Sequence, residues 1–282
     1  MSINCNLEVL CIGNELLIGK TLNTNAQWLG KRIAALGLQI SRITTVSDNS
    51  KEISNALKEA LNHKPDFIIT VGGLGPTFDD KTLAGIAEAL KLKLKVNKKA
   101  LQMIEEKYRN YARKTEEKEI KLTRYRVKMA KLPKGAKPLP NPEGTAPGVL
   151  LKQNNTTIIA LPGVPSEMKV IFKDSVEPIL KEKLGSAYFY ETSFYTSGIM
   201  ESTLAPLIDK TMHDNPHVYV KSHPKGKETK PHIELHLSTT AANPKTAKNR
   251  VNKALTHLAK MITKEGGKTR LIDSGATKTD TL

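Results

Sequence analysis

The fold is decided by residues 67–80, which read Phe67-Ile68-Ile69-Thr70-Val71-Gly72-Gly73-Leu74-Gly75-Pro76-Thr77-Phe78-Asp79-Asp80. The first five residues are apolar or β-branched, which predicts a buried strand. The apolar spacing of residues 83–90 predicts a helix after the loop. A glycine-rich turn between a strand and a helix start exposes backbone N–H groups beside the positive end of a helix dipole. This segment therefore predicts an anion-binding loop.

The two carboxylates of this loop suggest a metal ion. Asp79 and Asp80 have the wrong sign for holding phosphate directly, but they suit a hard divalent cation that a phosphate shares. A second interpretation is that Thr77 caps the helix and Asp80 favours its first turn. The loop is not a P-loop, because no Gly-Lys-Ser/Thr follows. It is not the dinucleotide fingerprint either, because Phe78 stands where the third glycine belongs.

Strands and helices alternate through the first half of the chain. We expect strands at residues 7–13, 38–46 and 66–71, and helices at residues 25–36 and 50–61. This alternation predicts an α/β fold with right-handed crossovers and a mainly parallel sheet. Ligands of such sheets bind at the carboxyl ends of the strands. The loops that begin at Gly13 and Gly72 are therefore the candidate site, and the first of them contains Glu15.

The second half predicts a long helical stretch, a loop and a further domain. Residues 97–130 look helical and charged, and residues 132–148 are rich in proline and glycine. A hairpin is expected around Asn154, followed by a helix over residues 168–183. We expect further strands near residues 189–196, 218–221 and 232–238, and helices near 201–211 and 244–263. The predicted domains are residues 1–184, residues 185–264 and a polar, frayed tail over residues 265–282.

Composition excludes several classes of protein. The chain has 282 residues, 39% of them hydrophobic, and a mean hydropathy of -0.36. No apolar run approaches the length of a membrane span, and no signal sequence opens the chain. Cys5 and Cys11 form no C-x-x-C pair, which argues against structural zinc and a disulfide framework. We therefore expect a cytoplasmic protein without a membrane partner.

The net charge of +16 is concentrated in one segment. Residues 81–140 carry 18 lysines and arginines against 6 acidic residues. Lysines dominate and alternate with glutamates, which favours a solvated helical face over a nucleic-acid surface, where arginines and aromatics are more typical. A third interpretation is that the segment overhangs the phosphate loop and attracts an anionic substrate.

Four loops together resemble one known family. They are Gly13-Asn14-Glu15-Leu16-Leu17-x-Gly19 followed by Asn23-Thr24-Asn25, then Gly72-Gly73-Leu74-Gly75-Pro76-Thr77-x-Asp79-Asp80, then Asn141-Pro142-x-Gly144-Thr145-Ala146-Pro147-Gly148, and Leu161-Pro162-Gly163-x-Pro165-Ser166-Glu167. This set resembles the competence/damage-inducible CinA family, over roughly residues 5–263. The first domain of that family is similar to the molybdopterin-binding MoaB/MogA fold. The resemblance does not include the family's amidohydrolase domain, so its activity is not expected here.

The resemblance implies both a fold and a reaction. It implies a three-layer α/β domain with a mainly parallel sheet, followed by a small α/β domain. It also implies metal-dependent hydrolysis of ADP-ribose-like nucleotide pyrophosphates, with magnesium, manganese or cobalt as the divalent metal. Asp80 occupies the position of the aspartate that closes the glycine loop in the related molybdopterin enzymes. Asp80, Asp79 and Glu15 are therefore the predicted catalytic residues, and Asp80 and Asp79 the predicted metal ligands.

The expected ligand is small, phosphorylated and nucleotide-like, and the resemblance implies a homo-oligomer. The predicted substrate-binding residues are Gly72, Gly73, Gly75, Thr77, Asn25, Gly144, Thr145, Gly163, Lys221 and Lys225. One alternative function is molybdopterin binding or adenylylation. The other is nucleic-acid binding through residues 81–140, which we consider the weaker alternative because it gives the four glycine loops no role.

Overall fold

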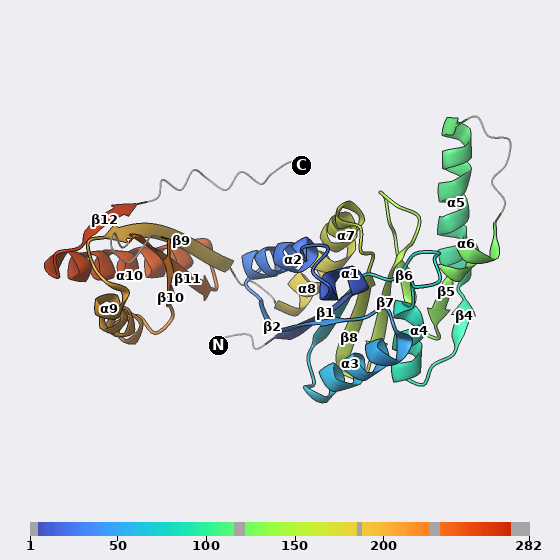
Figure 1. The fold of residues 1–282 in the computed structure, drawn as a ribbon, viewed down its shortest axis with the longest axis horizontal. Helices are drawn as coiled ribbons and strands as arrows, with labels where there is room; N and C mark the ends of the chain where they lie inside the picture. Colours follow the sequence, from blue (N-terminus) through green and yellow to red (C-terminus); the bar gives the residue numbers. More distant parts are fainter. Residues whose placement is uncertain (1–4, 116–121, 185–187, 226–231, 272–282) are drawn as a thin grey trace. The chain divides into compact units, whose positions relative to one another are not determined.

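The computed structural model describes residues 5–115, 122–184, 188–225 and 232–271 (Figure 1). The chain divides into two compact units. The first contains residues 1–34 and 38–185, and the second contains residues 35–37 and 186–282. This division falls beside the predicted boundary after residue 184.

A six-stranded sheet forms the centre of the first unit. Its strand order is β2-β1-β3-β8-β7-β6. The first four of these strands pair in parallel and the last two antiparallel, so the predicted α/β fold with a mainly parallel sheet is confirmed. The strands are β1 Asn6–Ile12, β2 Gln39–Val46, β3 Phe67–Val71, β6 Lys137–Leu139, β7 Gly148–Gln153 and β8 Thr156–Leu161.

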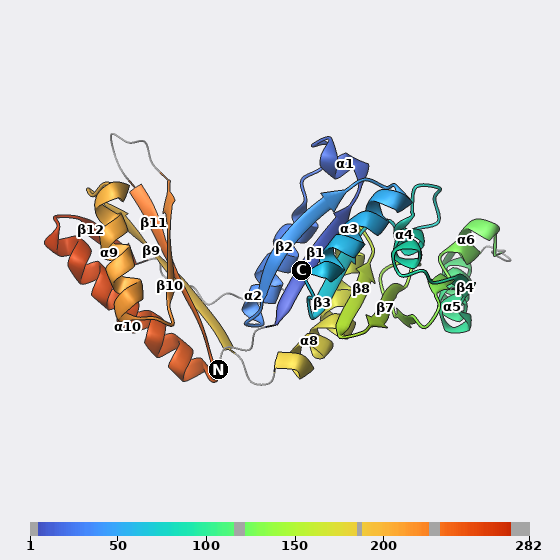
Figure 2. The same cartoon turned by 90° about the horizontal axis from the view of Figure 1, so that it is seen from below.

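Helices cover both faces of this sheet. Figures 1 and 2 show α2, α7 and α8 on one face and α3 and α4 on the other. On the second face, α3 and α4 pack closely, because a Cβ on Gly85 would lie 2.5 Å from the side chain of Ile53. The helices are α1 Asn14–Leu17, α2 Thr24–Ala35, α3 Ser50–Asn62, α4 Thr82–Ala89, α7 Pro165–Ile171, the π-helical turn η1 Phe172–Val176 and α8 Glu177–Leu184.

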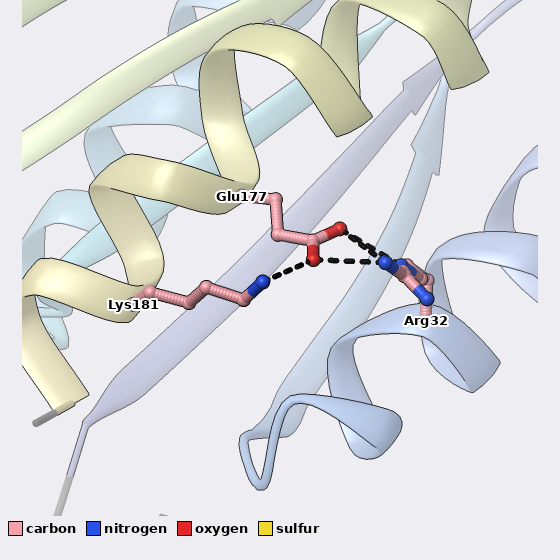
Figure 3. Close-up of polar contacts among 3 residues, drawn as sticks. All are labelled: Arg32, Glu177 and Lys181. Carbon is pink, nitrogen blue, oxygen red and sulfur yellow. Dashed lines mark hydrogen bonds and ion pairs between the residues drawn. The ribbon is translucent and has the colours of Figure 1, made fainter. Parts of the chain in front are cut away.

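A buried carboxylate joins α2 to α8. Arg32 donates two hydrogen bonds of 2.9 and 2.6 Å to Oε2 of Glu177 and a third of 2.8 Å to Oε1 (Figure 3). Lys181 contacts the same carboxylate at 2.8 Å, and the Glu177 side chain is only 7% exposed. Burial opposes ionisation of Glu177, but the hydrogen bonds from Lys181 and Arg32 outweigh it and hold its pKa below the usual range.

The predicted helix over residues 97–130 is wrong in its length. Helix α5 covers Lys98–Thr115 and a short helix, α6, covers Arg124–Lys128, while residues 116–121 lie outside the described residues. After α6 the chain becomes extended, and β5 Lys131–Pro133 pairs with β4 Leu94–Val96. Ala100 and Ile104 anchor the first half of α5 in the core, so this segment belongs to the first unit.

The second unit is a four-stranded antiparallel sheet with two helices. Its strand order is β10-β11-β9-β12, and every neighbouring pair is antiparallel. The element order β-α-β-β-α-β with this sheet order defines a ferredoxin-like arrangement. The elements are β9 Tyr188–Ser197, α9 Glu201–Asp214, β10 Tyr219–Pro224, β11 His232–Ala241, α10 Pro244–Lys264 and β12 Lys268–Leu271.

The strand β12 corrects the predicted polar tail. Residues 268–271 pair with residues 194–197 of β9. All four residues of β12 are exposed, so the strand has no buried face. Backbone hydrogen bonds hold this strand in the sheet. Such bonds require no hydrophobic pattern, so the sequence does not reveal the strand. Residues 272–282 lie outside the described residues. Among the helices that the structure describes, none is long and apolar enough to cross a membrane.

The buried carboxylate of Glu177 generates a prediction about pH. Glu177→Gln removes the charge-assisted bonds to Arg32 and Lys181. The free energy of unfolding of the variant at pH 7 should therefore be about 2 kcal/mol lower than that of the wild type. Because the pKa of Glu177 is lowered by folding, its stabilising contribution is complete above the ordinary pKa of 4.5 and is lost as the pH falls below it.

Urea unfolding at pH 7 and pH 3.5 checks this, with the exposed Glu182→Gln on the same helix as the matched control. The control should lie within about 0.5 kcal/mol of the wild type at both pH values. An equal loss for Glu177→Gln at both pH values would contradict the assignment.

Candidate active site

Three strands of the first sheet end around Gly72. Gly72 has a φ of 108°, and a Cβ there would overlap the carbonyl oxygen of Ile12, the last residue of β1. Its N–H donates to the carbonyl oxygen of Leu161, the last residue of β8, at 3.0 Å. The glycine therefore joins the carboxyl ends of β1, β3 and β8, where ligands bind in sheets of this kind.

A second predicted residue, Gly163, meets Gly72 from another loop, and a third, Asn25, binds Gly163. A Cβ on Gly163 would lie 3.4 Å from the Cα of Gly72, and Asn25 at the start of α2 donates to the carbonyl oxygen of Gly163 at 2.7 Å. The other polar atom of that amide, Oδ1 of Asn25, is buried without a partner among the described residues. Gly72, Gly163 and Asn25 thus form one group that includes an unsatisfied acceptor.

Thr82, at the start of α4, holds the glycine loop, and the sequence does not mark it as a site residue. Thr82 is fully buried, and its hydroxyl donates to the carbonyl oxygen of Gly72 at 2.7 Å. Its backbone N–H donates to the carbonyl oxygen of Gly73 at 3.2 Å. Gly73 has a φ of 65°, and a Cβ there would overlap the Thr82 hydroxyl. The start of α4 therefore fixes both glycines.

The tip of the loop is organised by its own carboxylates. Oδ2 of Asp80 accepts from the N–H of Thr77 at 2.8 Å and from its hydroxyl at 2.6 Å, and the same hydroxyl contacts Asp79. A Cβ on Gly75 would lie 2.6 Å from Oδ2 of Asp80, so this position also needs glycine. The hydrogen bond from Thr77 is the main reason why the pKa of Asp79 lies below its usual value.

Helix α4 begins at Thr82, so the alternative that Thr77 caps this helix is wrong. Thr77 and Asp80 instead close a turn within the loop, because the N–H of Asp80 donates back to the carbonyl oxygen of Thr77 at 3.3 Å. The residue at the N-cap is Lys81, whose side chain makes no capping bond. The capping pattern in the sequence was real, but it stabilises a loop that lies before the helix.

A lysine from the basic segment contacts this loop. Lys128, the last residue of α6, donates from its ammonium group to the carbonyl oxygen of Thr77. Burial lowers the pKa of Lys128, and the charges of Asp80 and Asp79 oppose that shift. This contact fits the interpretation that part of the basic segment overhangs the glycine loop. Arg126, two residues earlier on α6, lies over the ring of Tyr108, 3.9 Å from its centroid, which ties α6 to α5.

Two carboxylates alone make an incomplete metal site. Within the residues that the structure describes, no group of three or more histidine, cysteine or acidic side chains is placed to hold a metal ion. One oxygen of Asp80 is already taken by Thr77. Magnesium is often bound by one or two carboxylates together with phosphate oxygens and water. Asp79 and Asp80 therefore fit a divalent cation only when a phosphorylated ligand supplies further oxygens.

The loop before β7 forms a second arrangement at this edge of the sheet. Oδ1 of Asn141 accepts from the N–H groups of Glu143 and Gly144, and its Nδ2 donates to Glu167 at 2.7 Å and to Ala146 at 2.8 Å. A Cβ on Gly144 would overlap the Glu167 carboxylate. This network joins the predicted Gly144 to the start of α7, and Asn141 and Glu167 are the residues that carry it.

Thr145 lies in the same loop but faces another feature. It lines a cleft of about 200 Å³ between this loop and α5, together with Asn141 and Lys107. The ammonium group of Lys107 donates to the carbonyl oxygen of Pro142 across that cleft. The contacts of the described residues join Thr145 to α5 and not to the glycine loop.

The remaining predicted residues are not brought to the glycine loop by any contact of the described residues. Glu15 lies in α1, and its carboxylate occupies the space beside Gly13 in its own loop. Lys221 and Lys225 belong to the second unit, where Lys221 is exposed on β10 and Lys225 pairs with Glu234 at 3.4 Å. The structure thus assembles Asn25, Gly72, Gly73, Gly75, Thr77, Asp79, Asp80 and Gly163.

The family of the first unit is shown by comparison with known proteins. The model of the family described as "Probable molybdopterin binding domain" matches residues 8–182, which include all the loops described above. The chain therefore belongs to this family. The predicted similarity of the first domain to the molybdopterin-binding fold is confirmed.

Similar proteins extend over most of the chain. A protein of Sulfolobus acidocaldarius is 42% identical over 270 residues, which cover 95% of this chain and 99% of that protein. A protein of Pyrobaculum calidifontis is 44% identical over 257 residues, with coverages of 90% and 94%. The crystal structure of "the protein CinA with unknown function" from Thermoplasma acidophilum is 39% identical, with a TM-score of 0.57, and covers 63% of this chain and 99% of that chain. This match supports the resemblance to CinA, and CinA membership of the whole chain stays a prediction.

Thr82 generates a prediction about the glycine loop. Thr82→Val keeps the shape of the side chain and removes the hydrogen bond to Gly72, so the free energy of unfolding should fall by about 1–3 kcal/mol. Hydrogen exchange at the amides of residues 72–75 should become faster. The exposed Thr44→Val on β2 is the matched control and should cost less than half as much stability. Unchanged exchange in Thr82→Val would show that the hydroxyl does not hold the loop.

Proposed function

We propose that the first unit binds a phosphorylated pterin of the molybdopterin class at the carboxyl edge of its parallel sheet. The phosphate group would lie against the glycine loop, between Gly72 and Thr77. The observation that carries the proposal is the convergence of Gly72, Gly163 and Asn25 at the ends of β1, β3 and β8. The description of the family as molybdopterin-binding supports this ligand.

The backbone at this point suits a close approach by a ligand. Gly72 and Gly163 carry no side chains, so a phosphate can reach the backbone of both loops. The buried, unpartnered Oδ1 of Asn25 offers an acceptor for an N–H group of the ligand, and pterin rings carry several such donors. A ligand bound here would therefore satisfy a polar atom that the protein leaves without a partner.

Side chains of both charges lie beside the loop and affect anion binding in opposite directions. Lys128 brings a positive charge to Thr77, and Lys81 at the N-cap of α4 brings a second one. Asp79 and Asp80 repel a bare phosphate, so a divalent cation between these carboxylates and the phosphate would remove the repulsion. Affinity should therefore rise when magnesium is present.

A second candidate function is metal-dependent hydrolysis or transfer at a phosphoanhydride, with ADP-ribose as the model substrate. The observation in its favour is the ionised Asp79 beside Asp80 on the same loop. Thr77 donates two hydrogen bonds to Asp80 and contacts Asp79 through its hydroxyl alone, and Asp79 is the more exposed of the two, so Asp79 has the greater freedom to hold a cation or orient water. A divalent metal bound there would neutralise charge on the phosphate oxygens and help to form hydroxide. Adenylylation of a pterin would use the same loop and metal with ATP.

The first experiment measures pterin binding. The wild-type protein is equilibrated with molybdopterin, and the retained pterin is quantified by fluorescence after oxidation and gel filtration. We expect retention in the wild type and at least a tenfold loss of affinity in Lys128→Ala, since hydrogen bonds to charged groups contribute about 1.5–3 kcal/mol. Lys134→Ala, an exposed lysine outside the loop, is the matched control and should bind normally. No retention by the wild type would remove the pterin proposal.

The second experiment measures product. Wild type, Asp79→Asn and Asp80→Ala are incubated with ADP-ribose and with magnesium, manganese or cobalt, and AMP is detected by liquid chromatography. AMP from the wild type, with a loss of at least 100-fold in Asp79→Asn, would establish the hydrolase. Asp80→Ala also loses the bonds that shape the loop, so it reports on the loop and not on chemistry alone. Absence of AMP under all conditions would exclude this candidate.

Self-association and a cytoplasmic location stay predictions. We propose a homo-oligomer, on the strength of the family resemblance alone. The homo-oligomer and the cytoplasmic location do not depend on which ligand the glycine loop binds.

A further inference from the structure

The second unit has one sheet face that its own helices leave open. Helices α9 and α10 both pack against the same face, where Phe194, Leu235 and Leu258 form part of the core (Figure 2). Among the described residues of this unit, no element covers the opposite face. We call that surface the open face. It is made by every second residue of β9, β10, β11 and β12.

Strand register shows which side chains share the open face. Tyr195 of β9 lies directly opposite Arg270 of β12 and Glu234 of β11, and Lys221 of β10 lies opposite His236 of β11. Phe194, the neighbour of Tyr195 in sequence, is fully buried on the helix side, which fixes Tyr195 on the open face. Residues that pair directly across antiparallel strands lie about 5 Å apart, so these side chains form continuous rows.

Aromatic rings lie on the two central strands of this face. Tyr195 and His232 stack, with ring centroids 4.6 Å apart and planes 21° from parallel. His232 is exposed and Tyr195 half-buried, so the outer side of the stack is open to solvent. Tyr219 on β10 is 58% exposed and faces Ser238 in the same set of positions. Large exposed rings on a sheet are typical of surfaces that stack unpaired bases.

Positive side chains surround these rings. Lys221, Lys268 and Arg270 are all exposed, and Lys268 and Arg270 come from the edge strand β12. The acidic residues of the face are both engaged: Glu234 pairs with Lys225 at 3.4 Å, and Glu191 lies 3.4 Å from His236. The face is therefore positive around an aromatic centre, which is complementary to a chain of phosphates with exposed bases.

We propose that the open face of the second unit binds single-stranded nucleic acid. Bases stack on Tyr195 and His232, and the backbone phosphates lie against Lys221, Lys268 and Arg270. A duplex fits less well, because its bases are already stacked on one another and cannot reach the rings. This site differs from the basic segment over residues 81–140, and the proposal does not depend on what the glycine loop binds.

Fluorescence anisotropy with fluorescein-labelled 12-residue oligo(U) and oligo(dT) tests the proposal. We expect the wild type to bind at least one of them at low salt, with affinity that falls as salt rises. Tyr195→Ala should weaken binding by about tenfold or more, as loss of base stacking does, while Tyr195→Phe keeps the ring and should bind as the wild type does. Lys221→Glu should weaken binding and make it less dependent on salt.

Matched controls separate this face from other basic surfaces. Lys248→Glu makes the same change of charge on α10, and Lys99→Glu makes it on α5 of the first unit; both residues are exposed. Neither should alter affinity by more than about twofold, a change within the range of rim charges.

Four results would each overturn the proposal: no binding by the wild type, equal binding of a 12-base-pair duplex, binding lost only in Lys99→Glu, or a dimer that Tyr195→Ala dissociates. Thermal unfolding of each variant shows whether it is folded, and Tyr195→Phe with Lys221→Glu decides the outcome if Tyr195→Ala does not fold.

Discussion

The close approach of Gly72 to Ile12 is the constraint on which the first unit depends. No side chain fits between them, so β3 can end against β1 only with a glycine at this point. The same residue donates its N–H to Leu161 and accepts through its carbonyl group from Thr82, so one residue joins three strands and a helix. The start of α2 with Asn25 and the loops that carry Gly163 and Asp80 take their positions from this junction. A surface assembled from loops is thereby held by a rigid part of the sheet.

The sequence was sufficient for the parallel strands and for half of the site, because both leave local patterns, whereas β6 lies in the stretch expected to be a loop. Buried parallel strands are continuous apolar runs, as residues 67–71 are, and loops that need glycine show it directly. Lys128 could not be found in this way. It reaches Thr77 from 51 positions further along the chain, and nothing in its own neighbours marks that contact. Thr82 stands just before the helix that the sequence predicts over residues 83–90, and a buried hydroxyl that bonds to a distant turn has no signature in spacing.

The two units solve the problem of burying a sheet differently. The first buries both faces of its central strands β1, β3 and β8 under helices, while the edge strand β2 is largely exposed. The second buries one face, and β11 shows it by strict alternation of buried Ile233, Leu235 and Leu237 with partly exposed neighbours. That alternation was visible in the sequence and placed the helix-covered face. The chemistry of the other face was not visible, because the partners of Tyr195 lie on β11 and β12 and only strand register brings them together.

Strand β12 also covers an edge of the second sheet. It occupies the edge of the second sheet and uses the backbone hydrogen-bonding groups of residues 194–197 in β9. A chain shortened to Gly267 would leave that edge of β9 bare, and a bare strand edge recruits strands from other molecules. Lys268 and Arg270 are charged residues of the edge strand β12, and they disfavour pairing of a strand from another molecule with β12. Four residues without a buried side chain therefore cover the edge of β9 and end this side of the second sheet with a charged strand.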